Sequence, residues 1–401
     1  MSAATDRTPL LPTSNGNSSP NGRSASPKPQ TALQKFAELI KAEDGPSYTA
    51  SLRYFLFGSW LNILLVFVPL SYCSHVFNWD AGLRFLFSFI AIMPLAALLG
   101  TCTDQLSLKL GETLSGLLNA TFGNAVEIIV GIAALLQGEL RIVQTSLLGS
   151  ILSNLLLVLG CSFLAGGLVY DESNFQVTAA QASSSLMTLT CITLVIPAAY
   201  HSAKSHAGGI DEVIHILPFP SGPIGAESFT QVVDGSDLDD RSNQGLRIIS
   251  RGTAILLLLV YVAFLIFQLR THSYLYSYEA EVERADRLGL ARPAARRQPE
   301  PEEPDMNPVA AGLGLLAATI VTSFCADYLV ASIEETAERY HIPRAFIGLI
   351  LLPIVANAAE HVTSVWMAMK DKMELTIGIC VGSSIQIAAF VIPLLVIVGW
   401  A

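Results

Sequence analysis

Nine long apolar stretches dominate the sequence and limit the folds that it can adopt. Each is long enough to cross the hydrocarbon core of a bilayer, for which an α-helix needs about 20 residues. Of the 401 residues, 52% are hydrophobic and 14% are charged, whereas about a quarter of the residues in a soluble domain are charged. The sequence therefore predicts an all-α integral membrane protein with nine transmembrane helices, at 54–73, 85–103, 113–136, 142–168, 175–199, 252–269, 308–333, 345–369 and 375–400.

The polar segments between these stretches predict the domain organisation. Residues 1–50 are rich in Ser, Pro, Asn and Thr and hold no apolar run of a signal peptide, so we expect a disordered tail before a first helix within 51–80. Of two long connections, 201–248 and 271–306, the second is acidic and Pro-rich and separates two halves. If six helices cross the membrane between the tail and this connection, the basic residues of the tail and the arginines of the connection lie on the same side of the membrane. Positively charged segments favour the cytosolic side, so we expect both the tail and the connection in the cytosol. The loop 201–248 would then face the lumen.

Charge and cysteine patterns argue against several other classes of protein. The net charge of −10 comes largely from loops, and no basic patch with interleaved aromatic residues indicates nucleic-acid binding. All six cysteines lie in or beside apolar stretches without CxxC spacing, so we expect no disulfide framework. The sequence has no HExxH zinc site and no paired-aspartate or GxSxG protease motif. We therefore expect neither an enzyme nor a bound cofactor.

A polar motif recurs in the two halves of the chain. The segment GNAVE at 123–127 recurs as ANAAE at 356–360, which is 233 positions later, and Gly149-Ser150 recurs as Gly382-Ser383 at the same offset. Chance repetition of apolar segments would not preserve these polar positions. The recurrence predicts two repeats, at 81–270 and 307–401.

The two copies of the motif enter the membrane from opposite faces, because five predicted crossings separate Glu127 from Glu360. An inverted repeat of this kind is typical of transporters, whose binding site lies near the midplane where broken helices meet. Gly123 and Pro353 mark the expected breaks, since both residue types interrupt helices.

Glu127 and Glu360 are the candidate ion-binding residues. An ionised carboxylate at membrane depth costs about 2.5 kcal/mol or more, so a matched pair is seldom structural. A hard divalent cation takes about 6 to 8 oxygen ligands, of which two carboxylates supply up to about four. No Cys or His cluster favours zinc or copper, so we expect Ca²⁺. Further oxygen ligands are available from Asn124, Asn357, Ser150, Ser153, Ser383 and Gln386.

The same carboxylate pair predicts coupling to protons. Without a cation between them, two buried carboxylates repel each other and take up protons, so Ca²⁺ and H⁺ compete for one site. His361 follows Glu360 directly and is a candidate for tuning this competition, although a histidine beside a polar kink is more often structural.

Two strings resemble the paired alpha-repeats of the vacuolar calcium/proton exchangers of fungi and plants, within the calcium/cation antiporter superfamily. They are GLLNATFGNAVEIIVGIAALLQGELRIVQTSLLGSILSNLLLVLG and GLILLPIVANAAEHVTSVWMAMKDKMELTIGICVGSSIQ. The resemblance implies exchange of cytosolic Ca²⁺, with Mn²⁺ as a second candidate substrate, for protons of an acidic organelle. It also implies a multi-pass protein of the vacuolar membrane, with Glu127 and Glu360 as the cation and proton sites surrounded by Asn124, Asn357, Ser150, Ser383 and Gln386.

The resemblance also marks positions where this sequence differs from the family. The family usually has TEEL where this chain has Thr103-Asp104-Gln105-Leu106, which leaves Asp104, together with Asp327, as a candidate for the path by which ions reach the site. The family has eleven helices, whereas the ninth predicted helix here ends at the last residues. A nontransporting, C-terminally truncated paralogue or regulatory fragment is therefore the alternative to an exchanger.

The remaining expectations concern regulation, sorting and assembly. The acidic segment 271–306 resembles the cytosolic acidic helix that is implicated in calcium-dependent regulation of the family. Residues Asp6 to Leu11 resemble an acidic dileucine sorting signal for the vacuole or lysosome. The expected partners are the lipid bilayer, Ca²⁺ and protons, without nucleic acid, and a homo-oligomer remains an open alternative.

Overall fold

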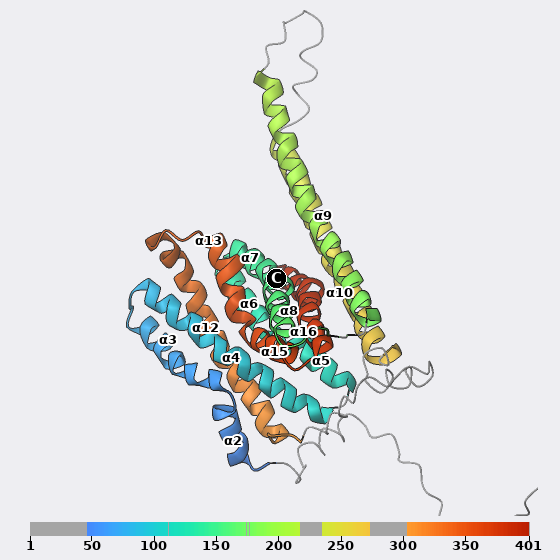
Figure 1. Ribbon diagram of the computed structural model, residues 1–401. Coiled ribbons are helices and arrows are strands. Elements are labelled where there is room, and N and C mark those ends of the chain that lie inside the picture. Colours follow the sequence, from blue (N-terminus) through green and yellow to red (C-terminus); the bar gives the residue numbers. More distant parts are fainter. Residues whose placement is uncertain are drawn as a thin grey trace, which may run out of the picture. The chain divides into compact units, whose positions relative to one another are not determined.

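The computed structural model describes residues 46–110, 112–173, 175, 177–216, 235–272 and 303–400, and the regular elements in these ranges are all helices (Figure 1). The N-terminal tail, the dileucine pattern and the acidic segment 273–302 lie outside the described residues. The helices of the first half are α2 (Tyr48–Phe57), η1 (Trp60–Val66), α3 (Phe67–Val76), α4 (Ala81–Leu110), α5 (Glu112–Phe122), α6 (Ala125–Leu136), α7 (Leu140–Leu152), η2 (Ser153–Val158), α8 (Leu159–Gly167), α9 (Val177–Ile216), α10 (Gly235–Ile266) and η4 (Phe267–Thr271). Those of the second half are α12 (Pro308–Arg339), α13 (Arg344–Phe346), η6 (Ile347–Leu351), α14 (Leu352–Ala356), α15 (Ala358–Ala368), α16 (Met373–Gln386), η7 (Ile387–Val391) and α17 (Ile392–Val398).

The nine predicted membrane crossings are confirmed in length and composition within the described residues. Six are long apolar helices, and three are pairs of helices joined at a bend. The predicted breaks at Gly123 and Pro353 correspond to bends of 45° between α5 and α6 and of 57° between α14 and α15. A third bend, of 82° between α2 and η1, was not predicted.

The segment 201–248 differs from the loop that the sequence predicts. Helix α9 continues to Ile216 and α10 begins at Gly235, so both helices extend beyond the apolar stretches. The sequence has no proline between Pro197 and Pro218, so no proline interrupts α9 between Pro197 and Ile216. Apolar length therefore predicted the membrane crossing but not the continuation of the helix beyond it.

The inverted repeat is visible in the register of the helices. Helices α6 and α15 begin at Ala125 and Ala358, and α7 and α16 begin at Leu140 and Met373, with the same offset of 233 positions each time. Each of α7 and α16 then passes into a π-helical segment, η2 or η7. Such segments were not predicted, and they are frequent at functional sites because they re-aim side chains.

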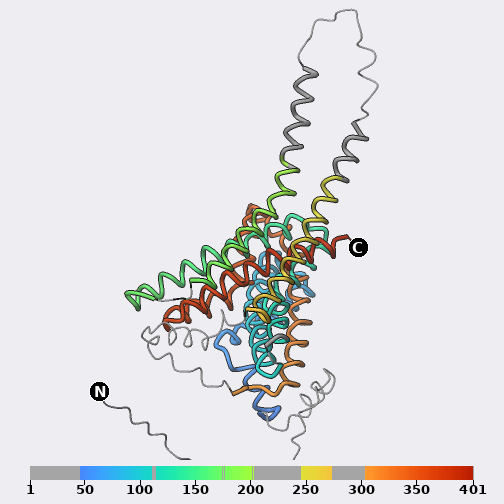
Figure 2. Tube along the Cα trace, turned by 90° about the vertical axis from the view of Figure 1, so that its right-hand side faces the viewer, coloured from blue at the N-terminus to red at the C-terminus, as the bar shows by residue number. Residues whose placement is uncertain are grey.

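Helices α4 and α12 pack closely along their length (Figures 1 and 2). Both helices bury small residues, such as Ala91 of α4 and Ala318 and Ala326 of α12, and small residues let the backbones of membrane helices approach closely. The bent pair of helices at the start of the described chain, α2 followed by η1 and α3, packs on α4 and α12 through two polar contacts. The Ser71 and Ser88 hydroxyls form a hydrogen bond of 2.7 Å, and the Asn307 N–H donates to the Ser51 hydroxyl at 2.9 Å.

Candidate cation site

The two glutamates of the repeat occupy equivalent positions directly after the helix breaks. Glu127 lies in the first turn of α6 and Glu360 in the first turn of α15. The positive end of each helix dipole therefore lies beside a carboxylate, which favours negative charge there. Both residues line a single cavity of about 470 Å³. The structure thus brings the two predicted residues together.

The cavity reaches the ends of several helices at one membrane face. Asp104 near the end of α4, Gln268 of η4 and Glu374 at the start of α16 line it, together with Asn119 of α5. We call this face the Asp104 side, and the opposite face, where α4 begins, the Asp80 side. The cavity connects Glu127 and Glu360 with the Asp104 side.

Polar side chains from the two repeats meet beside the carboxylates. The Asn124 amide donates a hydrogen bond to the Gln386 side-chain oxygen, and Gln386 and Ser383 both line the cavity. The Asn357 amide donates to the backbone carbonyl of Ser150 at 3.2 Å. These contacts cross between the repeats: one holds the break before α6 against α16, and the other holds the break before α15 against α7.

Several buried polar atoms in this region have no hydrogen-bond partner in the structure. They include the Asn357 side-chain oxygen, one carboxylate oxygen of Glu360 and the Ser153 hydroxyl. Unsatisfied buried polar groups are costly, and a bound ion or its water would satisfy them. These oxygens are of the type that hard cations prefer.

Asn154 of η2 is not among the site residues that the sequence predicts. It is 1% exposed, and neither atom of its amide has a hydrogen-bond partner among the described residues. It directly follows Ser153, on a π-helical segment that packs against α15 and α16. An asparagine within an otherwise apolar stretch was the available signal, because a buried amide in a membrane needs a partner.

Ser150 contributes to a second, much smaller cavity. This cavity has a volume of about 20 Å³, which is room for one water molecule. Glu127, Ser146 and Ser150 supply its polar lining, and the other lining residues are apolar. It lies between α4, α6, α7, α12 and α14, and it shares Glu127 with the large cavity.

Three other positions singled out in the sequence lie away from the large cavity. Asp327 is exposed on α12, and its backbone carbonyl accepts a hydrogen bond from Gln137. The partly exposed side chain of His361 lines neither cavity. Gln105, at the position of a family carboxylate, is buried, and its side-chain oxygen accepts the backbone N–H groups of Asp305 and Met306. Of the two candidates for an ion path, only Asp104 borders the cavity.

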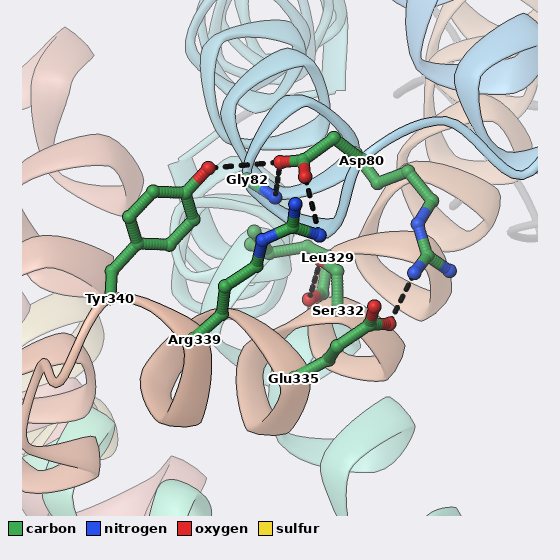
Figure 3. Close-up of polar contacts among 8 residues, drawn as sticks. Asp80, Gly82, Leu329, Ser332, Glu335, Arg339 and Tyr340 are labelled. Atoms are coloured by element: carbon green, nitrogen blue, oxygen red, sulfur yellow. Dashed lines mark hydrogen bonds and ion pairs between the residues drawn. The ribbon is translucent and has the colours of Figure 1, made fainter.

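Ion pairs join α4 to the end of α12 on the Asp80 side (Figure 3). Arg339 contacts the Asp80 carboxylate at 2.5 Å, and Arg84 pairs with Glu335. The Tyr340 hydroxyl also donates to Asp80, at 2.9 Å. Helices α4 and α12 are thus held together at the face opposite the open cavity.

These contacts stabilise the charged form of Asp80. The Tyr340 hydroxyl is the main reason that the pKa of the Asp80 carboxyl is lowered from its ordinary value of 3.8, and the Gly82 N–H and the Arg339 guanidinium act in the same direction. The same hydrogen bond raises the pKa of Tyr340. The pair therefore stays ionic throughout the weakly acidic range.

The fold and the site define a class of protein. Two carboxylates, carried by oppositely oriented repeats, line one cavity between the membrane faces, surrounded by neutral oxygen donors. Within the described ranges, no three His, Cys, Asp or Glu side chains converge as a metal cluster. This arrangement is that of an inverted-repeat membrane transporter for cations.

Comparison with known proteins identifies the family. The family model described as sodium/calcium exchanger protein matches residues 81–270 and 310–401, and the chain belongs to this family. It is 41% identical over 347 residues to the vacuolar calcium ion transporter of Schizosaccharomyces pombe, covering 86% of this chain and 72% of that protein. It is 37% identical over 339 residues to the Ca²⁺/H⁺ antiporter of Synechocystis sp., covering 84% and 82%.

A solved structure has the same fold. Native YfkE superposes with a TM-score of 0.58 and 32% sequence identity, covering 85% of this chain and 82% of that one. Another solved structure of YfkE is described as a Ca²⁺/H⁺ antiporter. The expected inverted-repeat antiporter fold is therefore confirmed.

Proposed function

We propose that this chain is a secondary active transporter that exchanges cytosolic Ca²⁺ for protons of the vacuole, as a multi-pass protein of the vacuolar membrane. The observation that carries the proposal is the single cavity lined by Glu127 and Glu360. The names of the relatives support the substrates and the location. They also favour an exchanger over the nontransporting alternative, and over an enzyme.

In the proposed mechanism, Glu127 and Glu360 hold either one Ca²⁺ or protons. A divalent cation offsets both negative charges, whereas the empty pair is destabilised by repulsion and burial until it takes up protons. Asn124, Asn357, Ser150, Ser383 and Gln386 complete the oxygen shell, and Asn154 is added to them because its amide is buried without a partner. Mn²⁺ is a second candidate substrate, since it also prefers oxygen ligands.

Transport of Ca²⁺ is coupled to transport of protons if the site can switch between the two membrane faces only when it holds Ca²⁺ or protons. A buried, unpaired carboxylate is costly in a closed site, so the empty ionised form resists closure. Ca²⁺ then moves in one direction and protons in the other, through the same residues.

Transport by sealed vesicles tests the proposal. With an acidic interior, vesicles that contain the chain should accumulate Ca²⁺, and a protonophore should abolish the accumulation. Glu127→Gln and Glu360→Gln should each reduce uptake by about tenfold or more, equivalent to at least about 1.4 kcal/mol of lost stabilisation. Asp327→Asn, which changes an exposed carboxylate away from the cavity, is the matched control and should transport normally. Uptake that survives both glutamate substitutions would refute the proposal.

A further inference from the structure

A row of side-chain contacts joins α3 to α4 and leads toward the Asp80 side. The Ser71 and Ser88 hydroxyls form a hydrogen bond in this row. Because α3 and α4 are joined by a short turn and run antiparallel, one helical turn further along places His75 of α3 opposite Arg84 of α4. Arg84 acts electrostatically on His75, which agrees with this register. His75 therefore lies beside the guanidinium that forms an ion pair with Glu335.

The imidazole ring of His75 is held by an aromatic ring of α12. It stacks on Tyr328 with ring centroids 4.2 Å apart and an angle of 24° between the planes. Tyr72 of α3 contacts the same tyrosine, with 6.4 Å between the ring centroids. A protonated imidazole would stay on this ring, because contacts between a cation and an aromatic face are favourable. A positive charge gained by His75 would thus remain beside Arg84.

Two buried nitrogen atoms in this layer have no hydrogen-bond partner among the described residues. They are Nδ1 of His75 and Nε of Arg84. A neutral imidazole can accept a hydrogen bond from a guanidinium at its unprotonated nitrogen, whereas a protonated imidazole has only donors. The neutral form of His75 is therefore compatible with the charge of Arg84, and the protonated form repels it in a region where water screens the charges poorly.

The carboxylates near this layer do not cancel a charge on His75. Three of them lie on the surrounding helices or at their ends: Asp80, Asp327 and Glu335. Asp80 and Glu335 each have an arginine partner, and Asp327 is exposed. Among the described residues, Arg84 is the charged group that acts on His75. Protonation of His75 would therefore set two cations against the single carboxylate of Glu335.

The Asp80 side is the face that we expect toward the acidic interior of the vacuole. Helix α12 begins beside Gln105 of α4, whose side-chain oxygen accepts the N–H groups of Asp305 and Met306 on the Asp104 side. We expect the connection before α12 in the cytosol, which would make the Asp104 side cytosolic. A group at the opposite face that responds to weak acid would then sense the supply of protons.

We propose that His75 is a positioning residue that links the acidity at the Asp80 side to the opening of that face, because its protonation displaces Arg84 and weakens the ion pair between Arg84 and Glu335. Histidine ordinarily changes charge near pH 6.5, between the pH of the cytosol and that of an acidic organelle. The Asp80 carboxylate stays charged in this range, so its own ion pair does not respond. When protons are scarce in the interior, the closed form persists and stored Ca²⁺ cannot flow back. The proposal rests on the proposed function.

The reactivity of an introduced thiol tests the proposal without transport. Ser332 of α12 is fully buried and lies three residues before Glu335 (Figure 3). In the purified chain, Ser332→Cys should react with a water-soluble thiol reagent about tenfold faster at about pH 5.5 than at about pH 7.5. Each rate is divided by the rate for the unfolded chain at the same pH, and the six native cysteines give the background.

Variants of His75 separate its charge from its packing. In the Ser332→Cys background, His75→Gln should remove the difference between the two pH values. His75→Arg, which is charged at both, should react fast at both. His75→Gln should have no further effect once Arg84→Gln has removed the neighbouring charge, because the two residues act as one unit. An unchanged pH response in His75→Gln, or slow labelling of His75→Arg at both pH values, would overturn the proposal.

His341 supplies a matched control on the same face. It is exposed just beyond the end of α12, with a φ of 54°, and Asn tolerates this left-handed conformation. His341→Asn should keep the full pH response of the parent chain. Loss of the response in His341→Asn as in His75→Gln would show that a general effect of the surface charge, and not His75, controls the opening.

Ca²⁺ uptake distinguishes failure of this inference from failure of the proposed function. In sealed vesicles with a fixed external pH, uptake should rise as the interior is acidified, and the rise should be shallower in His75→Gln. Uptake with the same dependence on interior pH in both chains would refute the role of His75 and leave the proposed function intact. If the parent chain takes up no Ca²⁺ at any interior pH, the proposed function fails, whereas pH-dependent labelling of Ser332→Cys would still support the contact between His75 and Arg84.

Discussion

Asp80 shows how a single side chain can stabilise one arrangement of the membrane helices. Its carboxylate receives hydrogen bonds from Tyr340 of the other half and from Gly82, and an ion pair from Arg339. Exposed ion pairs alone contribute little to stability, but this carboxylate has several partners that belong to both halves. It therefore fixes the distance between the start of α4 and the end of α12.

The first prediction concerns the pH dependence of this contact. Because the pKa of Asp80 is lowered from 3.8, its stabilising effect is present at neutral pH and is lost as the pH falls through the lowered value. In Tyr340→Phe, the main cause of the shift is removed, so the loss of stability should be smaller and should be complete at a higher pH. Thermal unfolding of the detergent-solubilised protein between about pH 3 and 6 measures this. Identical acid profiles for the variant and the parent chain would contradict the assigned role of Tyr340.

The second prediction concerns Asn154. Its buried amide has no partner in the structure, so a ligand role and a merely structural role predict different results. Asn154→Leu should remove an oxygen ligand and raise the KM for Ca²⁺ by about tenfold, while the relief of an unsatisfied polar group keeps or increases thermal stability. A stable variant with an unchanged KM would show that Asn154 does not contact the ion.

At the scale of the helices, the tight contact at Gly149 provides the third prediction. Gly149→Ala would force α7 away from the Leu349 carbonyl, which is backbone and cannot rotate aside. The variant should lose about 1–3 kcal/mol of stability, as is typical of overpacking. Gly382→Ala is the control at the equivalent position of the other repeat, where a Cβ atom meets nothing. Equal melting temperatures for both variants would contradict the packing difference between the repeats.

The sequence predicted the helices better than their irregularities. The nine crossings followed from apolar length, and the two breaks beside Asn124 and Asn357 followed from Gly123 and Pro353 within a repeated motif. The π-helical segments η2 and η7 did not follow, because a π-helix depends on the packing of neighbouring helices and has no local residue signal. The continuation of α9 beyond its apolar stretch was also missed, since apolar length says nothing about a polar segment that stays helical.

The residues of the candidate site could be predicted from the sequence where they belong to the motif that recurs in both halves of the chain. Glu127, Glu360 and their amide and hydroxyl neighbours stood out because the same residues recur at one offset. Asn154 has Ile387 at its equivalent position, so self-comparison could not reveal it. The contact between Asp80 and Tyr340 joins residues 260 positions apart, and a single sequence carries no sign of such a pair.

For the whole molecule, the two membrane faces differ in a way that fits one state of a transport cycle. The large cavity reaches the Asp104 side, whereas ion pairs and tight packing close the Asp80 side. In a transport cycle the open face must close and the closed face must open, so the contacts that close the Asp80 side should be weak enough to break.

The fourth prediction concerns this balance. Charge reversal of both partners, Arg84→Glu with Glu335→Arg, should preserve transport, whereas Arg84→Glu alone should repel Glu335 and favour opening on the Asp80 side. Labelling from the Asp80 side at an introduced cysteine, with and without each substitution, measures the opening. An Arg84→Glu variant with unchanged labelling would show that the ion pair does not hold the closed face.

Direct measurement of binding tests most sharply whether Glu127 and Glu360 hold one Ca²⁺ in competition with protons. Titration of the purified chain with Ca²⁺ at several pH values should give one site per chain, release of protons on binding and weaker affinity at lower pH. Glu127→Gln and Glu360→Gln should each abolish the site, while Asp327→Asn should bind Ca²⁺ like the parent chain. Retention of pH-dependent Ca²⁺ binding in either glutamate variant would contradict the account.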